Sequence, residues 1–350
     1  MRRLIFLAAL CLILSGCGWM DGSHVTVTDH EEKSPGVLTS ALSAADYQEL
    51  TAVLEKMVEG GTENGVIQVP DYDQEKLQSG IAKAVDYVRD QYSLGAYAVE
   101  SVEYDIGSGG GQPAISVNIS YIHGRSELRQ IQTVQNMEEA GVKIREALKA
   151  CNEGIVLRVQ NYQQIDLKQM VADFATEYPE AVMEMPQVAV GVYPDWGTDR
   201  VVEMKFTYQT SRDVLRQMRS QVQLVFMSAS YYIDKDSDAL QKYIQLRDFI
   251  MERHSYITET SITPAYSLLI YGVGDSRAMA TTYAAMCRQA GLECKLVTGT
   301  REGEFWCWNM IQVDGKYYHV DLLHNEGEFQ YLPGEEMNGY VWDYSGYPEN

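Results

Sequence analysis

The sequence has few positively charged residues. Lysine and arginine together number 28, against 49 aspartate and glutamate residues, and the formal net charge of the 350-residue chain is −21 at pH 7. Loss of Arg2 and Arg3 with an N-terminal leader would make the remaining chain more negative still. A surface of this sign repels phosphate backbones and anionic lipid headgroups. The composition therefore excludes nucleic acid as a partner.

The apolar run at the N-terminus is too short to cross a membrane. It extends from Leu4 to Leu14, whereas a membrane-spanning helix needs about 20 residues. After the basic start Met1-Arg2-Arg3, such a run fits the apolar part of a secretory signal peptide. The sequence therefore predicts export rather than a membrane-spanning helix at this end.

A cysteine follows this run directly. Leu14-Ser15-Gly16-Cys17 resembles the lipobox of bacterial lipoproteins, which implies removal of residues 1–16 and diacylation of the Cys17 thiol. Two acyl chains hold a protein stably on a membrane. We therefore expect a lipid-anchored lipoprotein on the extracytoplasmic face of a bacterial cell membrane. The alternative is an ordinary signal peptide that happens to contain a cysteine.

Cysteine is scarce in the rest of the chain. The four beyond Cys17 are Cys151, Cys287, Cys294 and Cys307, and none has the Cys-x-x-Cys spacing typical of structural zinc sites. An even number in an exported protein permits a disulfide. Cys294 and Cys307 are expected on neighbouring strands. The alternative is that these cysteines are small buried apolar side chains.

The middle of the chain shows two diverged copies of one pattern. Residues 17–45 are polar and predict a flexible tether after the lipidated cysteine. Gly65-Val66-Ile67-Gln68-Val69 then corresponds to Gly154-Ile155-Val156-Leu157-Arg158-Val159. A period of this length indicates duplicated domains, here 46–145 and 146–235. Each copy is expected to be an α+β unit of strand, helix, two strands and helix.

The expected elements of the two copies follow from apolar periodicity and turn residues. In the first copy, a helix comes first and has one apolar stripe of Leu77, Ile81, Ala84, Val85 and Val88. Strands over 96–106 and 114–122 follow it, and a helix over 126–139 closes the copy. In the second copy, strands over 187–192 and 201–208 are followed by a helix from Ser211. For residues 222–227, a strand is the alternative to a continuation of this helix.

Residues 236–350 carry three motifs in order. The first is Gly272-Val273-Gly274-Asp275-Ser276, followed by Ala280 and Ala290-Gly291-Leu292. The second is Trp306-Cys307-Trp308-Asn309, and the third runs from Gly315 to Asp321. This arrangement resembles the core of the transglutaminase-like superfamily, whose enzymes share a papain-like Cys-His-Asp site. The resemblance implies a transglutaminase-like (papain-like) domain. Together with the internal duplication, it predicts an α+β chain in which this domain follows two tandem α+β repeats.

The resemblance assigns three positions to a remnant triad. In the family a cysteine nucleophile begins the central helix, a histidine acts as base and an aspartate orients it. The resemblance implies that this central helix spans 276–289 here, and Asp314-Gly315 predicts a hairpin between strands over 304–313 and 316–322. Here Ser276 stands at the cysteine position, Trp306 at the histidine position, and Asp321 is kept. A serine hydroxyl needs a base even more than a thiol does, and an indole nitrogen only donates hydrogen bonds. The sequence therefore predicts a catalytically degenerate domain, a pseudoenzyme.

Several alternatives stay open. His324 could serve Ser276 as a relocated base, which would make the protein a divergent acyltransferase or peptidase. His319, Asp321 and His324 could form a metal site; otherwise the sequence predicts no cofactor. Cys307 is expected to point to the opposite face of its strand from Trp306, away from the site. The structural alternative for Ser276 is a helix N-cap, for which Asp275 is also suited.

Three roles match these observations. The first is binding or scaffolding at the cell envelope, with an envelope protein or a peptide or glycan as ligand. Trp306 could stack on such a ligand or plug the cleft. The second is the divergent enzyme, and the third is a structural role in which the repeats present the terminal domain away from the membrane.

Overall fold

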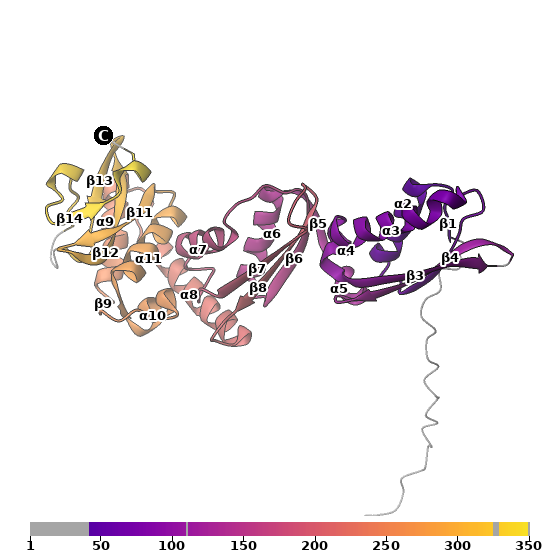
Figure 1. Cartoon of the computed structure of the whole chain (residues 1–350). Coiled ribbons are helices and arrows are strands. Elements are labelled where there is room, and N and C mark those ends of the chain that lie inside the picture. Colours follow the sequence, from indigo (N-terminus) through magenta and orange to yellow (C-terminus); the bar gives the residue numbers. More distant parts are fainter. Residues whose placement is uncertain (1–41, 110, 325–328, 349–350) are drawn as a thin grey trace, which may run out of the picture.

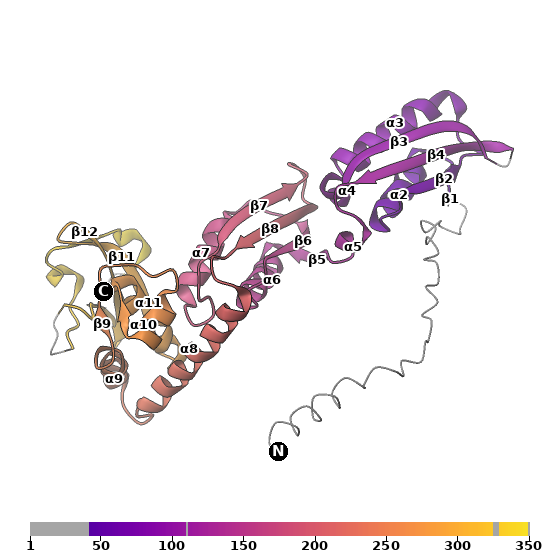
Figure 2. The same ribbon diagram turned by 90° about the horizontal axis from the view of Figure 1, so that it is seen from below.

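The molecule is elongated, with three α+β units in a row (Figures 1 and 2). The computed structural model describes residues 42–109, 111–324 and 329–348. The expected signal peptide, Cys17 and almost all of the tether lie outside these residues. Within the described ranges, no helix is both long enough and apolar enough to cross a membrane.

The first unit is a four-stranded sheet covered by helices on one face. Its strands have the order β1-β2-β4-β3, with β1 and β2 parallel and the other pairs antiparallel. The elements are β1 (Leu42–Ser43), α2 (Tyr47–Glu59), β2 (Asn64–Gln68), α3 (Gln74–Asp90), α4 (Ser93–Ala98), β3 (Val99–Gly109) and β4 (Gln112–Tyr121).

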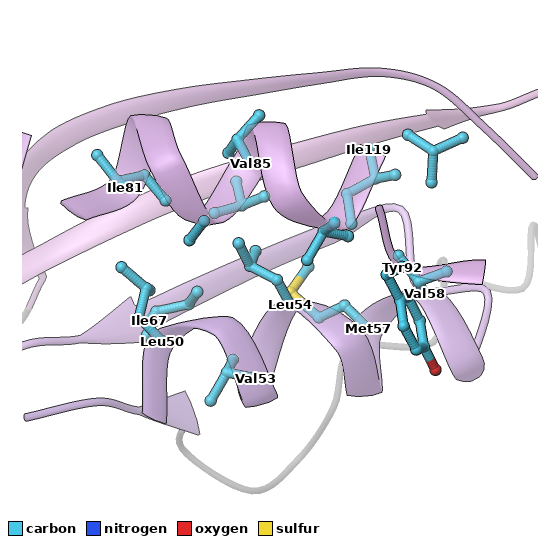
Figure 3. Close-up of a cluster of buried hydrophobic side chains, with 14 of the residues drawn as sticks. Leu50, Val53, Leu54, Met57, Val58, Ile67, Ile81, Val85, Tyr92 and Ile119 are labelled. Carbon is cyan, nitrogen blue, oxygen red and sulfur yellow. The ribbon is translucent and has the colours of Figure 1, made fainter. Parts of the chain in front are cut away.

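The core of this unit lies between the helices and the sheet. The Asp46 carboxylate caps α2 by accepting from the backbone of Gln48 and Glu49, which fixes where the helix begins. Figure 3 shows Leu54, Ile67 and Ile119 converging between α2, α3 and the strands. The predicted stripe on α3 is confirmed, since Leu77, Ile81, Ala84, Val85 and Val88 are all buried.

The second unit repeats the same topology. Its strands have the order β5-β6-β8-β7, again with one parallel pair followed by two antiparallel pairs. An identical strand order is what a duplication produces, but the duplication itself stays a prediction. The elements are β5 (Gln132–Asn136), α6 (Met137–Lys149), β6 (Gly154–Asn161), α7 (Leu167–Glu177), β7 (Gln187–Tyr193) and β8 (Arg200–Thr207).

The helix expected over 126–139 is wrong. A short helix, α5 (Arg125–Leu128), is followed by β5, and α6 begins only at Met137. The Asn136 side chain accepts from the Glu139 amide at 3.0 Å and so caps α6 there. Because β5 pairs with β6, the second sheet already begins at Gln132, ahead of the expected boundary at 146.

Two other expected elements differ in extent. The strand expected from Ala96 starts at Val99, because α4 runs to Ala98. The segment from Ser211 is one continuous helix, α8 (Arg212–Tyr232), so 222–227 is not a strand. Its buried residues Val222 and Phe226 are four apart, as on one face of a helix. This helix packs into the core of the third unit rather than closing the second.

The third unit packs a buried helix against an antiparallel sheet of order β13-β12-β11-β14. The predicted central helix is confirmed as α11 (Ser276–Gln289), and the predicted hairpin at Asp314-Gly315 joins β12 to β13 with positive φ at both residues. The other elements are α9 (Ala239–Met251), β9 (Ser255–Tyr256), α10 (Pro264–Tyr271), β10 (Val273–Gly274), β11 (Cys294–Arg301), β12 (Glu304–Val313), β13 (Lys316–Val320), η1 (Gly334–Glu336), β14 (Tyr340–Trp342) and η2 (Tyr344–Gly346).

Candidate functional site

Ser276 lies at the first turn of α11 and is 6% exposed. The helix cap is its neighbour Asp275, whose carboxylate accepts from the Ala278 amide at 2.8 Å. The Ser276 hydroxyl oxygen accepts from the backbone N–H of Cys307 at 3.3 Å. The central helix and β12 therefore meet at Ser276, the position that the motif resemblance assigns to the nucleophile.

The Asp321 carboxylate is the centre of a hydrogen-bond cluster, and its side chain is 4% exposed. One oxygen accepts from the Leu323 amide at 2.9 Å. The other accepts from Tyr340 Oη at 2.6 Å, Trp306 Nε1 at 2.9 Å and Arg301 Nη1 at 3.2 Å. These four donors, one of them cationic, compensate the buried charge.

Trp306, which the motif resemblance places at the histidine position, donates a hydrogen bond to the Asp321 carboxylate. Its Nε1–H donates to Asp321, and its ring lies 5.4 Å from the Tyr256 ring and 5.2 Å from the Arg301 guanidinium. An indole has no acceptor nitrogen. This position therefore keeps the bond to the carboxylate but offers no atom that could take a proton from Ser276.

His324 is linked to Asp321 through Tyr340. Its Nδ1 lies 3.1 Å from Tyr340 Oη, whose proton is already donated to Asp321. The Tyr340 oxygen must then accept from His324, so Nδ1 carries a proton. Among the described residues, no hydrogen bond joins His324 to the Ser276 hydroxyl. The relocated pair that the divergent-enzyme hypothesis requires is not formed here.

Cys307 lies against the start of α11, where its thiol faces Arg277 and Asp275. Cys307 therefore points to the opposite face of β12 from Trp306, as predicted, but this face lies toward the start of α11 and not away from it. The residue is 2% exposed, and burial raises the pKa of its thiol to about 11, although Arg277 opposes the shift. A thiol with this pKa is protonated at neutral pH and is a poor nucleophile.

Cys294 and Cys307 lie on neighbouring strands, as predicted, but they are not opposite each other. Cys294 pairs with Ile311, and Cys307 pairs with Thr298. The two cysteines are thus four residues apart along the ladder, about 13 Å at roughly 3.3 Å per residue, which is beyond disulfide reach. All four cysteines of the described chain are free thiols, and Cys151, Cys287 and Cys307 are buried.

The three residues considered for a metal site do not share one partner. His319 Nδ1 accepts from Trp308 Nε1 at 2.9 Å, whereas Asp321 and His324 both contact Tyr340. In the part of the chain that the structure describes, no group of three histidine, cysteine or acidic residues could hold a metal ion.

Arg301 and Tyr340 are site residues that motif reasoning missed. They come from β11 and β14, whose pairing places Arg301 opposite Tyr340. Neither belongs to the three motifs, and Tyr340 lies 19 residues after Asp321. The only signal for them was that a buried carboxylate without an imidazole partner needs other donors.

Comparison with known proteins identifies the third unit. The family model of the transglutaminase-like superfamily matches residues 228–322, from the end of α8 to just past Asp321. The chain therefore contains a transglutaminase-like domain within a mixed α+β architecture. No curated protein matches the chain.

Three solved structures are similar to parts of the chain. A candidate cysteine protease from Cytophaga hutchinsonii is 17% identical with a TM-score of 0.29, over 45% of this chain and 65% of that one. A TGase is 11% identical with a TM-score of 0.28, over 64% and 65%. A candidate protease from Parabacteroides distasonis is 11% identical with a TM-score of 0.24, over 77% and 44%. The chain thus covers less than two thirds of each, and likeness at this level says nothing about the chemistry of the site.

Proposed function

We propose that this chain is a lipid-anchored lipoprotein of the bacterial cell envelope whose transglutaminase-like domain binds or scaffolds without catalysing. The observation that carries the proposal is the 2.9 Å bond from Trp306 Nε1 to Asp321. At the position proposed for the base, the indole of Trp306 can only donate a hydrogen bond and cannot accept a proton. Loss of a triad member typically removes roughly four decades of rate or more.

The neighbouring groups support the same proposal. The Ser276 hydroxyl accepts from a backbone N–H, and no base activates it among the described residues. The backbone of Cys307 contacts Ser276, and burial raises the pKa of the Cys307 thiol so that it stays protonated at neutral pH. His324 bonds to Tyr340 instead of Ser276, which disfavours the divergent acyltransferase or peptidase.

The arrangement of the units supports a role in presentation. The first unit lies at one end of the molecule and the transglutaminase-like domain at the other, with the second unit between them (Figure 1). If Cys17 carries the lipid, the two α+β units hold the domain away from the membrane. There it would meet an envelope protein or a peptide or glycan ligand.

Two measurements test the proposal. For the anchor, a Cys17→Ser variant is compared with the parent chain after metabolic labelling with a radioactive fatty acid. We expect label only in the parent, and equal labelling of both would refute the lipid site.

For catalysis, the parent and a Ser276→Ala variant are incubated with amine donors and glutamine peptides, and we expect neither to form product. Product from the parent alone would refute the pseudoenzyme.

A further inference from the structure

A cavity lies on the face of the C-terminal sheet that points away from α11. The Asn309 side chain donates to Ala280 of α11, so its neighbours Trp308 and Met310 on β12 face the opposite side. On that side a cavity of about 430 Å³ opens between β13, η1 and the segment after β14. None of Ser276, Trp306 and Asp321 lines it.

His319 supplies this cavity with a hydrogen-bond donor of known orientation. The residue is 4% exposed, and its Nδ1 accepts from Trp308 Nε1 at 2.9 Å. Because the indole can only donate, Nδ1 carries no proton and Nε2 must carry one. Burial lowers the pKa of His319 to about 4, so the ring is neutral at physiological pH.

The Nε2–H of His319 has no hydrogen-bond partner among the described residues. It faces η1, where an added Cβ on Gly334 would lie 3.6 Å from Nε2. Both His319 and Gly334 line the cavity. Because the cavity opens to solvent, the acceptor for this N–H is either water or an oxygen of a ligand bound in the cavity.

The remaining walls favour a cation. Among the described residues, four aromatic side chains line the cavity: Tyr317, Trp342, Tyr344 and Tyr347. Of the described lining residues, Glu335 is the one that is acidic, and none is lysine or arginine. Aromatic faces attract ammonium groups, tryptophan most strongly.

One of these rings already has a cation beside it within the described residues. Lys295 Nζ lies 5.7 Å from the centroid of the Tyr317 ring and 3.7 Å from the carboxylate of Glu293. The charge of Lys295 is thus paired with Glu293, and the carboxylate of Glu335 is left to attract a cation in the cavity. The net character of the cavity is aromatic and anionic.

We propose that this cavity binds a small organic ammonium ion that also carries an acceptor oxygen, an amino alcohol of the choline class. The ammonium group lies against Trp342 and Tyr344 with Glu335 nearby, and the hydroxyl oxygen accepts from His319 Nε2–H. The volume lies in the range of small-molecule sites. This site is independent of the remnant triad and of the role proposed for it.

The test is isothermal titration calorimetry on residues 18–350, which keep every residue that the structure describes. The probes are choline, its uncharged isostere 3,3-dimethyl-1-butanol, tetramethylammonium and glucose. Choline is expected to bind at least about fivefold more tightly than the isostere, because the isostere lacks the charge. It should also bind more tightly than tetramethylammonium, which lacks the hydroxyl. Equal binding of choline and the isostere, binding of glucose alone, or binding of no probe would overturn the proposal.

Matched variants locate the binding. Glu335→Gln is expected to weaken choline binding about threefold or more, whereas Glu336→Gln, on the same short helix but outside the lining, leaves it unchanged. Tyr344→Ala should weaken it similarly without unfolding the domain, since Tyr344 is 61% exposed. Equal effects of the two glutamate variants, or no effect of Glu335→Gln and Tyr344→Ala, would refute this location.

Choline can be free or part of a lipid headgroup. Co-sedimentation with phosphatidylcholine vesicles, with phosphatidylglycerol vesicles as the control, separates the two sources. The free amino alcohol is expected, because a headgroup phosphate close to the ammonium would face Glu335 and because the headgroup oxygen is esterified. Sedimentation with phosphatidylcholine alone, abolished by Glu335→Gln, would identify the headgroup as the source of the same ammonium group.

Discussion

Replacing Trp306 by phenylalanine removes one donor from the buried Asp321 carboxylate and keeps an aromatic ring. The bond lost is the 2.9 Å contact from Nε1. A hydrogen bond to a charged group contributes about 1.5–3 kcal/mol, and the carboxylate is 4% exposed, so water cannot easily replace the donor. We therefore expect Trp306→Phe to lower the free energy of unfolding of this domain by about 1.5–3 kcal/mol.

A double-mutant cycle separates the bond from the loss of ring volume. The same substitution is made in an Asp321→Asn background, where the acceptor charge is gone. The cost of Trp306→Phe should be smaller there by about 1 kcal/mol or more, because only the volume term remains in full.

The assay is urea denaturation followed by tryptophan fluorescence. Trp308 and Trp342 stay in all four proteins and are 1% and 7% exposed, so they report unfolding of this same sheet. Trp196→Phe, at a position that is 57% exposed in the second unit, is the control and should cost less than about 0.5 kcal/mol. Equal costs in the two backgrounds, within about 0.3 kcal/mol, would refute the reasoning.

Three further predictions follow from the same geometry. Alkylation of the folded protein at pH 7.5, read by mass spectrometry, should modify the partly exposed Cys294 before Cys307, whose thiol pKa is about 11; faster modification of Cys307 would contradict this. The folded pKa of His319, about 4, lies below its ordinary 6.5, so between these values only the unfolded chain binds the proton. The contribution of neutral His319 to stability is therefore complete above pH 6.5, and about 3 kcal/mol of it is lost as the pH falls to 4. In denaturation measured from pH 4 to 7, His319→Gln should remove this part of the dependence of the unfolding free energy on pH. Asp275→Ala should cost about 1 kcal/mol through loss of the cap on Ala278, and an unchanged melting temperature would contradict it.

Elements with a local signal or a family motif could be predicted. The helix expected over 276–289 and the hairpin at Asp314-Gly315 match the structure. The helix follows from the family motif that ends at Ser276, and the hairpin from a turn that favours positive φ, which is set within two residues. The stripe on α3 was predictable because an apolar period of 3.6 is also a local signal.

The failures concern features that depend on distant pairing. Nothing local marks Gln132–Asn136 as a strand, because it becomes one by pairing in parallel with β6 beyond a helix. Likewise Arg301 and Tyr340 reach Asp321 only when β11 and β14 pair. Motif spacing identified the carboxylate, but its donors are assembled by the sheet.

The most direct test of the central claim is to restore the missing groups. The Ser276→Cys, Trp306→His double variant is compared with the parent and both single variants for amine incorporation into glutamine peptides. Since Asp321 and the helix start are in place, we expect product from the double variant and none from the parent or the single variants. An active parent that loses its activity in Ser276→Ala would contradict the account and would direct the search for the base to His324.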